Sequence, residues 1–240
     1  MPYIIKEYHA GNTIEIQKTY SARYGRKIPR GVNLHPTSEA VKKNNEKNAE
    51  MKLRLLLNAN FCPGDLFLML TYKDDAPSPA EAKKCLEKFM RNLRAQYKAE
   101  NLECKYISVT EYKNTRIHHH IVLNSIDPRK VQAAWIYGLV RSESLYGYDF
   151  AGLAAYLIKE TKKTFKETDS PSRKRWNQSK NLIIPKPIIR VVKAKEWCKK
   201  PRSRKGYIIE TNSIVNDVNI FGIPYQFYRM VAAQPMKLRI

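Results

Sequence analysis

The order of apolar and polar positions divides the chain into strand-like and helix-like segments. Near the start, the two kinds of residue alternate on both sides of a Gly-Asn pair, which is typical of a β-hairpin. In other stretches the apolar residues recur every three to four positions, as on one face of a helix. The pattern predicts, in chain order, a hairpin, a helix, a strand, a helix, two strands, a helix, a strand and a helix, over residues 3–25, 37–58, 66–72, 78–100, 104–112, 117–124, 127–138, 139–148 and 149–163.

The helix that begins after Ser78 has the clearest start signal. Ser78 is a suitable N-cap, Pro79 occupies the first helical position, and Glu81 completes a capping box. Residues 206–231 show no comparable order and indicate irregular structure, with a strand as one option. Because direct hairpins occur together with crossover helices, we predict an α+β fold in which helices cover a mostly antiparallel sheet.

Positive charge is the strongest global property of the chain. Its 240 residues hold 44 Lys and Arg against 22 Asp and Glu, a net charge of +22. Such an excess indicates a polyanionic partner, first of all nucleic acid. Over half of it lies in residues 159–205, with 17 Lys and Arg against 4 Asp and Glu.

Within this basic region, cations would hold phosphates and aromatic rings would stack on bases. A solvated surface with core aromatics is the other interpretation of the same residues. The candidates for contacts with nucleic acid are Lys163, Arg173, Lys174, Arg175 and Trp176.

The sequence also indicates where the protein works. No apolar run approaches the roughly 20 residues of a membrane-spanning helix, and the first residues lack the order of a secretory signal. The four cysteines show neither metal-ligand spacing nor a disulfide framework, so we expect reduced thiols. We therefore expect a cytoplasmic protein without a membrane partner. The chain has no G-x-x-x-x-G-K-[ST] loop, and so no helicase of its own is expected.

Residues 118–120 are three consecutive histidines in an apolar strand. Side chains alternate along a strand, so His118 and His120 share one face and His119 lies on the other. If residues 113–116 form a hairpin loop, Glu111 stands opposite His118 on the same face. One carboxylate and two imidazoles, with open positions left over, suit Mg²⁺ or Mn²⁺ in use and Zn²⁺ or Co²⁺ opportunistically.

Two simpler interpretations of the histidines stay open at this stage. They can be satisfied core or surface groups, as most single histidines are. A closed structural zinc site is the other, but it needs a fourth ligand, and no cysteine has an obvious claim to that position.

Tyr156 and Lys159 lie three residues apart on one face of the helix predicted over 149–163. Gly152, one turn earlier, and Lys163, two turns later, share this face. A small residue lets a DNA backbone approach, and a lysine attracts phosphate and favours the phenolate form of tyrosine. Taken alone, Tyr156 is more typical of a packing residue, and its weight comes from the combination with the histidine strand.

Three segments resemble the motifs of the rolling-circle replication initiators of phages and plasmids, within the HUH endonuclease superfamily. FLMLTY at 67–72 resembles the first motif, an apolar strand with a threonine. HHHIVL at 118–123 resembles the second, in which two histidines flank one residue, and YLIK at 156–159 resembles the third, a tyrosine nucleophile followed by a lysine. Glu111 matches the acidic third metal ligand that these initiators carry one strand earlier.

The resemblance implies a HUH-type core with a ferredoxin- or RRM-like sheet over residues 64–163. The N-terminal hairpin and helix, residues 1–63, and the basic extension, residues 164–240, are then accessory regions. The sequence departs from the family pattern at two positions. His119 stands where an aliphatic residue is usual, and Gly152 stands where members with two tyrosines could place the second one, so we expect chemistry with a single tyrosine.

For this family the implied activity is site-specific nicking and joining of single-stranded DNA at a replication origin exposed in a hairpin. Glu111, His118 and His120 would hold Mn²⁺ or Mg²⁺. Tyr156 would attack the scissile phosphate and remain joined to the DNA as a 5′-phosphotyrosine, while Lys159 would orient it or offset negative charge. A host helicase and polymerase are the expected protein partners.

Two other functions fit much of the same sequence. A relaxase or a single-tyrosine transposase of the same superfamily would share the chemistry and differ in its biology. A non-catalytic nucleic-acid-binding module of the RRM type would keep the fold and the charge. Such a module would present stacking aromatics on the sheet face, where the present pattern predicts Glu and His.

Overall fold

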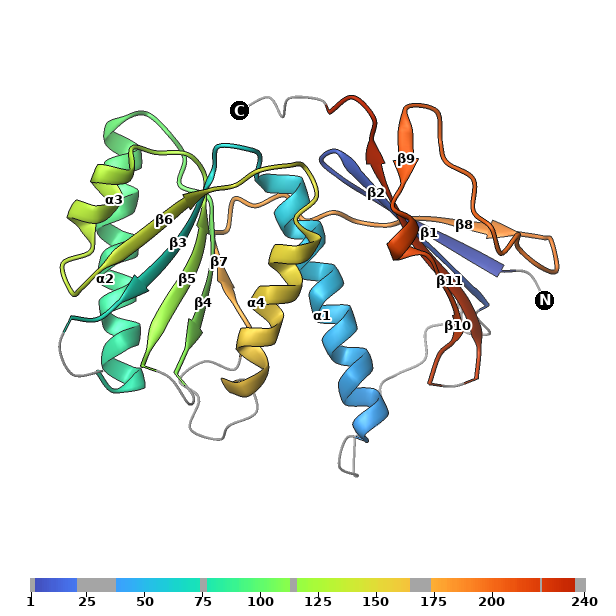
Figure 1. The fold of residues 1–240 in the computed structure, drawn as a ribbon, viewed down its shortest axis with the longest axis horizontal. Helices are drawn as coiled ribbons and strands as arrows, with labels where there is room; N and C mark the ends of the chain where they lie inside the picture. The colour runs from blue at the N-terminus through green and yellow to red at the C-terminus, as the bar shows by residue number, and fades with distance from the viewer. Residues whose placement is uncertain are drawn as a thin grey trace. The chain divides into compact units, whose positions relative to one another are not determined.

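The computed structural model describes residues 3–20, 38–73, 77–112, 116–164, 174–220 and 222–235. The chain forms two compact units, each built on its own antiparallel sheet (Figure 1). We call Asn60–Ile183 the middle unit, and Met1–Ala59 together with Ile184–Ile240 the end unit. The predicted α+β class with mostly antiparallel pairing is confirmed. In the described ranges no helix has both the length and the hydrophobicity needed to cross a bilayer.

The middle unit holds a five-stranded sheet in the order β6-β3-β5-β4-β7, in which every neighbouring pair is antiparallel. Helices α2 and α3 lie on one side of this sheet and α4 lies on the other (Figure 1). Its elements are β3 (Leu66–Thr71), α2 (Pro79–Ala99), β4 (Tyr106–Glu111), β5 (His118–Leu123), α3 (Pro128–Ala134), β6 (Val140–Ser144), α4 (Ala151–Thr164) and β7 (Asn177–Gln178).

The core of the middle unit follows from the alternation of β3. Leu66, Leu68 and Leu70 are all buried and pack in one cluster with the apolar stripe of α2, including Phe89 and Leu93. The intervening residues of β3 therefore point to the face that carries α4. The capping box predicted for α2 is present, since the Ser78 hydroxyl accepts from the Glu81 amide and Glu81 accepts from the Ser78 amide.

Helix α3 ends at Ala134, four residues earlier than the Gly138 end expected from the sequence. The chain leaves the helix because Trp135 is buried and its indole Nε1 donates to the Thr71 carbonyl, 3.0 Å away. The following residues then run along the end of β3, where the Thr71 amide donates to the Leu139 carbonyl. Tertiary packing thus overrides the local helical pattern.

The end unit contains a six-stranded sheet in the order β10-β11-β2-β1-β8, with β9 paired to β11. Strand β2 from the beginning of the chain pairs with β11 from its end, so both ends share one sheet. The domain boundaries that the sequence analysis expected after residues 63 and 163 remain a prediction. The elements are β1 (Tyr3–Ala10), β2 (Thr13–Tyr20), α1 (Glu39–Asn60), β8 (Ile188–Val192), β9 (Tyr207–Ile209), the 3₁₀ turn η1 (Thr211–Ser213), β10 (Val215–Val218) and β11 (Pro224–Ala232).

The two faces of the end-unit sheet are stabilised in different ways. On one face Arg54 of α1 forms a buried bidentate ion pair with Glu15 of β2, with Nε–Oε1 and Nη2–Oε2 distances of 2.6 and 2.9 Å. On the other face Ile14, Tyr228 and Met230 form an apolar cluster. A buried ion pair is favourable only when its geometry compensates for lost hydration, and the two parallel hydrogen bonds provide that here.

Residues 206–231, predicted to be irregular with a strand as one option, hold more regular structure than that. This segment holds β9, β10 and β11, and Gln226, Tyr228 and Met230 are buried in alternation along β11. The sequence does not show this alternation, because the buried face of β11 includes Gln226 and the other face includes Tyr225 and Phe227. In addition, β11 pairs with β2, far away along the chain, and no hairpin signal joins the two. Local turn chemistry cannot reveal a pairing of this kind.

Gly138 provides a test of the close approach between the segment after α3 and the end of β3. A Cβ atom at this position would lie 2.1 Å from the Thr71 carbonyl oxygen and 2.7 Å from the Lys73 amide. Because both neighbours are backbone atoms, we expect Gly138→Ala to lower the free energy of unfolding by about 1–3 kcal/mol in urea denaturation. The matched control is Gly152→Ala in α4, where a Cβ would meet no atom within 4 Å. This variant should raise the free energy of unfolding by about 0.5–1 kcal/mol. Equal stability of the two variants would contradict the close approach.

Candidate active site

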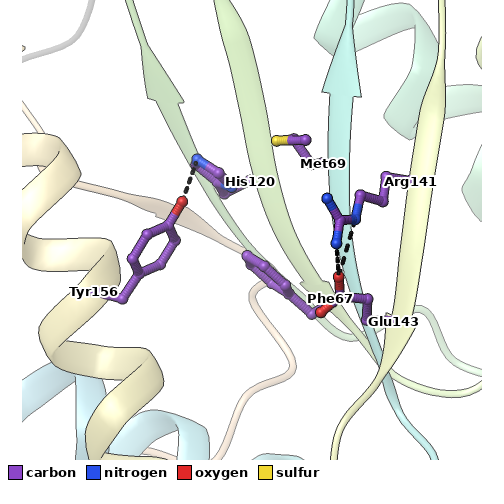
Figure 2. A pocket seen from close by; sticks show the side chains of 6 residues that line it. All are labelled: Phe67, Met69, His120, Arg141, Glu143 and Tyr156. Atoms are coloured by element: carbon purple, nitrogen blue, oxygen red, sulfur yellow. Dashed lines mark hydrogen bonds and ion pairs between the residues drawn. The ribbon is translucent and has the colours of Figure 1, made fainter.

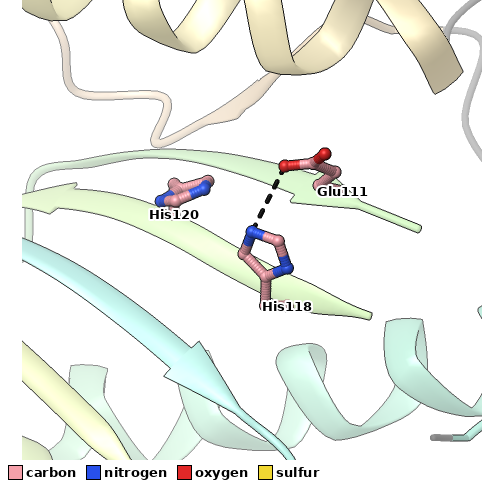
Figure 3. Close-up of side chains that lie close together, drawn as sticks. All are labelled: Glu111, His118 and His120. Atoms are coloured by element: carbon pink, nitrogen blue, oxygen red, sulfur yellow. Dashed lines mark ion pairs between the residues drawn. The ribbon is translucent and has the colours of Figure 1, made fainter. Parts of the chain in front are cut away.

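The register of β4 against β5 brings an acidic residue and two histidines together. Glu111 pairs with His118 across the two strands, as the sequence predicts, and His120 follows two residues later on the same face. Figure 3 shows the three side chains side by side on the two strands. One ligand atom from each lies within 4.8 Å of the others. Residues 113–115 of the expected loop lie outside the described residues.

The contacts of His118 favour a cation at this cluster. Its Nδ1 lies 2.9 Å from the Arg116 carbonyl, which can only accept, so Nδ1 carries a hydrogen. In the neutral ring this leaves a lone pair on Nε2, which lies 3.2 Å from Glu111 Oε2 (Figure 3). Two lone pairs at this distance repel unless a proton or a metal ion lies between them. A backbone carbonyl that fixes the second ring nitrogen is also the usual arrangement of a metal-binding histidine.

His120 has the properties of a neutral metal ligand. Burial, and then the proximity of the His118 ring, lowers the pKa of His120 to about 4, so the His120 ring is uncharged at neutral pH. Its Nδ1 is buried and has no hydrogen-bond partner in the part of the chain that the structure describes. Neutral imidazole is the form that binds metal ions. The donor set of one carboxylate and two imidazoles thus fits a divalent ion.

His119 belongs to the core and not to this cluster. Its side chain is fully buried on the opposite face, where Nε2 lies 2.9 Å from the Tyr72 hydroxyl and Nδ1 lies 2.8 Å from Thr110 Oγ1. Its ring also packs edge-to-face on Trp135. Both ring nitrogens are therefore occupied, and the departure from an aliphatic residue at this position does not disturb the His118–His120 pair.

Among the residues that the structure describes, no fourth ligand completes a closed metal site. In the described ranges, the only group of three or more potential ligands consists of Glu111, His118 and His120, and it contains no cysteine. A closed zinc site requires four protein ligands. A metal ion held by the observed group would keep open coordination positions, as it does in catalytic metal sites.

Tyr156 of α4 reaches this cluster with its hydroxyl group. The Tyr156 oxygen lies 3.3 Å from His120 Nε2, and the two rings meet edge-to-face (Figure 2). Ala154, Leu157 and Ile158 are buried, which holds the helix against the unit, whereas Tyr156 keeps 41% of its surface exposed. Helix packing thus presents the phenol to the histidine pair and to solvent at once.

The electrostatic environment of Tyr156 differs from the one expected. The sequence suggested that Lys159 would favour the phenolate, but the pKa of Tyr156 is raised, first by burial and then by the carboxylates of Glu160 and Glu111. Lys159 lies one turn along α4 and is exposed. In the structure as it stands, the phenol is therefore kept protonated, and ionisation would need added positive charge at the site.

Glu160 is a residue that the sequence analysis missed. It is half-buried in α4, four positions after Tyr156, and its charge acts on both Tyr156 and His120. The four-residue spacing places it on the same helix face as Tyr156, so the signal was present in the sequence. From the sequence, only Lys159 and Lys163 were considered as charges near Tyr156.

The basic candidates are only partly described. Lys174, Arg175 and Trp176 directly precede β7, which pairs antiparallel with β4. Because the pairing is antiparallel and β4 ends at Glu111, the residues before Asn177 lie on the side of β7 that is nearer the Glu111 end of β4. Trp176 Nε1 donates to Gln178 Oε1 at 2.9 Å. Lys163 lies in α4 but its side chain is not described, and Arg173 lies outside the described residues.

Comparison with known families adds one finding to this geometry. Residues 65–165 match the family model of replication-associated protein ORF2/G2P. The matched segment contains β3, β4, β5 and α4, and with them the cluster and Tyr156. The match supports a role as a replication initiator. No curated protein and no solved structure matches the chain significantly.

Metal binding can be measured without any assumption about catalysis. We expect isothermal titration calorimetry to detect Mn²⁺ binding at one site per chain, and His118→Ala to weaken it by at least about tenfold, because a ligand is lost. The matched control is His9→Ala, which removes a histidine in the end unit outside the cluster. Equal affinities of the His118 variant and the unchanged protein would contradict the assignment.

Proposed function

We propose that the protein is a rolling-circle replication initiator that nicks and rejoins single-stranded DNA at an origin through a 5′-phosphotyrosine. The observation that carries the proposal is the position of the Tyr156 hydroxyl, 3.3 Å from His120 and beside the Glu111–His118–His120 cluster. A nucleophile beside a group of metal ligands is the arrangement needed for metal-assisted cleavage of a phosphodiester bond. The family match of the same segment supports replication as its context.

The cluster would hold a divalent ion, Mn²⁺ or Mg²⁺, through Glu111, His118 and His120. When bound, such an ion supplies positive charge to the scissile phosphate and to the phenol oxygen. The raised pKa of Tyr156 would then be advantageous. A phenol that ionises only when metal and DNA are bound would be unreactive in their absence. This arrangement would limit nucleophilic side reactions.

The residues of the chain would perform the transfer in two steps. The Tyr156 oxygen attacks phosphorus, a bond forms between them, and the bond from phosphorus to the 3′-oxygen breaks. The phenol loses one proton and the departing 3′-oxygen gains one, so the step needs neither oxidant nor nucleotide. The reverse reaction with a new 3′-hydroxyl rejoins the strand and releases Tyr156.

Basic residues would position the DNA for this reaction. Lys159, exposed one turn from Tyr156, would offset charge on the phosphate, and Lys174 and Arg175, which precede β7 on the side nearer the Glu111 end of β4, would contact the DNA backbone. Trp176 adds a ring at the same edge of the sheet. A single-stranded origin, exposed in a hairpin, suits this surface, and a host helicase and polymerase would act beside it in the bacterial cytoplasm.

A relaxase or transposase would use the same chemistry, but the family match favours replication. A non-catalytic RRM-like module is disfavoured by the polar cluster, because buried ionisable ligands on a sheet face do not help to stack bases.

A covalent adduct is the decisive product. In a pool of random single-stranded oligonucleotides with Mn²⁺, we expect the unchanged protein to form an adduct that survives denaturing electrophoresis. Tyr156→Phe should lower it to background, because no other oxygen occupies that position. The matched control is Tyr146→Phe, which changes an exposed tyrosine in the same unit and should leave the adduct unchanged.

Two results would contradict the proposal. An adduct of equal yield in Tyr156→Phe would assign the nucleophile elsewhere. Salt-sensitive binding of DNA without any adduct from the whole pool would favour the non-catalytic module.

A further inference from the structure

A pocket of about 200 Å³ lies beside Tyr156, on the face of the middle-unit sheet that carries α4. Figure 2 shows the six side chains that line it, with Phe67 between Tyr156 and a charged pair on β6. Neither Glu111 nor His118 belongs to the lining. The lining residues are Phe67, Met69, His120, Arg141, Glu143 and Tyr156.

The order of the strands places this pocket next to the scissile phosphate of the proposed reaction. His120 lies on β5, with β4 and Glu111 on one side and β3 and β6 on the other. His120 itself lines the pocket, and the other lining strands, β3 and β6, follow it in steps of about 4.8 Å. With the phosphate at Tyr156, a nucleotide that continued toward β6 would lie over the pocket.

The inner part of the pocket suits a flat aromatic ring. The Phe67 ring is parallel to that of His120, with 4° between planes and 5.6 Å between centroids, and Tyr156 stands at 83° to His120. Met69 adds a polarisable thioether to the lining. Nucleobases stack on such surfaces through their π-faces. The volume is below the roughly 300 Å³ at which pockets begin to hold larger ligands, so it fits a single base.

The outer rim carries polar groups that can read the edge of a base. Arg141 and Glu143 are two residues apart on β6, on the same face, opposite Met69 and Phe67. Arg141 Nε and Nη2 lie 3.0 and 2.9 Å from the same oxygen, Glu143 Oε1. Glu143 Oε2 is thereby left to accept from a ligand, while Arg141 keeps the carboxylate from repelling the DNA backbone.

We infer that this pocket receives the base of a nucleotide directly adjacent to the nick, and that Glu143 selects bases with an exocyclic amino group over thymine. Adenine, cytosine and guanine each offer an amino group to a carboxylate. Thymine offers two carbonyl oxygens around a single N–H, and these repel the carboxylate. The inference rests on the proposed function and adds the residue that determines sequence preference at the cut.

Sequencing of the covalently captured oligonucleotides tests this inference. In the unchanged protein, we expect thymine to be depleted about tenfold at one position adjacent to the nick. Glu143→Gln should reduce this discrimination to less than roughly threefold, because the amide can also donate to carbonyl oxygens. Phe67→Leu should lower adduct yield for all four bases at that position, because stacking is tolerant of sequence.

The matched control is Glu87→Gln, an exposed acid on α2, which lies on the other side of the sheet. It should preserve both yield and preference. Full thymine discrimination in Glu143→Gln, or no discrimination against thymine at either flanking position of the unchanged protein, would overturn the pocket assignment while the adducts still confirmed the nicking chemistry. Absence of any adduct from the unchanged protein would instead overturn the proposed function, and this inference with it.

Discussion

The candidate site depends on one constraint, the antiparallel register of β4 and β5. With Glu111 opposite His118, strand alternation places both on the face that also carries His120. A shift of one residue would exchange every side chain of β5 between the two faces. His119 would then enter the cluster, and the polar rings of His118 and His120 would enter the leucine core. The register is therefore held by the packing of the opposite face, where His119 bonds to Tyr72 and Thr110.

The helices on the two sides of the middle-unit sheet have different roles. Helix α2 covers the leucines of β3 and makes the register costly to change. Helix α4 covers the other face through Ala154, Leu157 and Ile158 and leaves Tyr156 half-exposed at its edge. The sheet thus carries the cluster of Glu111, His118 and His120, and a separate helix carries Tyr156, the nucleophile of the proposed reaction. Such a division suits a reaction in which a covalently attached strand must be held and later released.

Local signals in the sequence were enough to predict the α+β class, the capping box of α2 and the opposition of Glu111 and His118. Each depends on residues close together in the chain, where strand and helix periodicity are reliable. The end of α3 and the strands after residue 206 were not predictable in this way, because Trp135 and β11 find their partners in β3 and β2. The same limit applies to the site. The place of Tyr156 on a helix face could be deduced, but its 3.3 Å approach to His120 and the acidic influence of Glu160 arise only when α4 packs on the sheet.

The pairing of β2 with β11 sets the order in which the protein can be completed on the ribosome. Translation delivers the whole of Asn60–Ile183 before β11 emerges, so the segment that carries the cluster and Tyr156 can fold while the chain is still growing. The β1–β2 hairpin is made before the middle unit, yet its partner strand arrives after it. During that interval the apolar side chains of Ile14 and Ile16 lack Tyr228 and Met230, against which they finally pack. Strand β2, which precedes the middle unit, thus gains its second neighbour only from a strand that follows that unit.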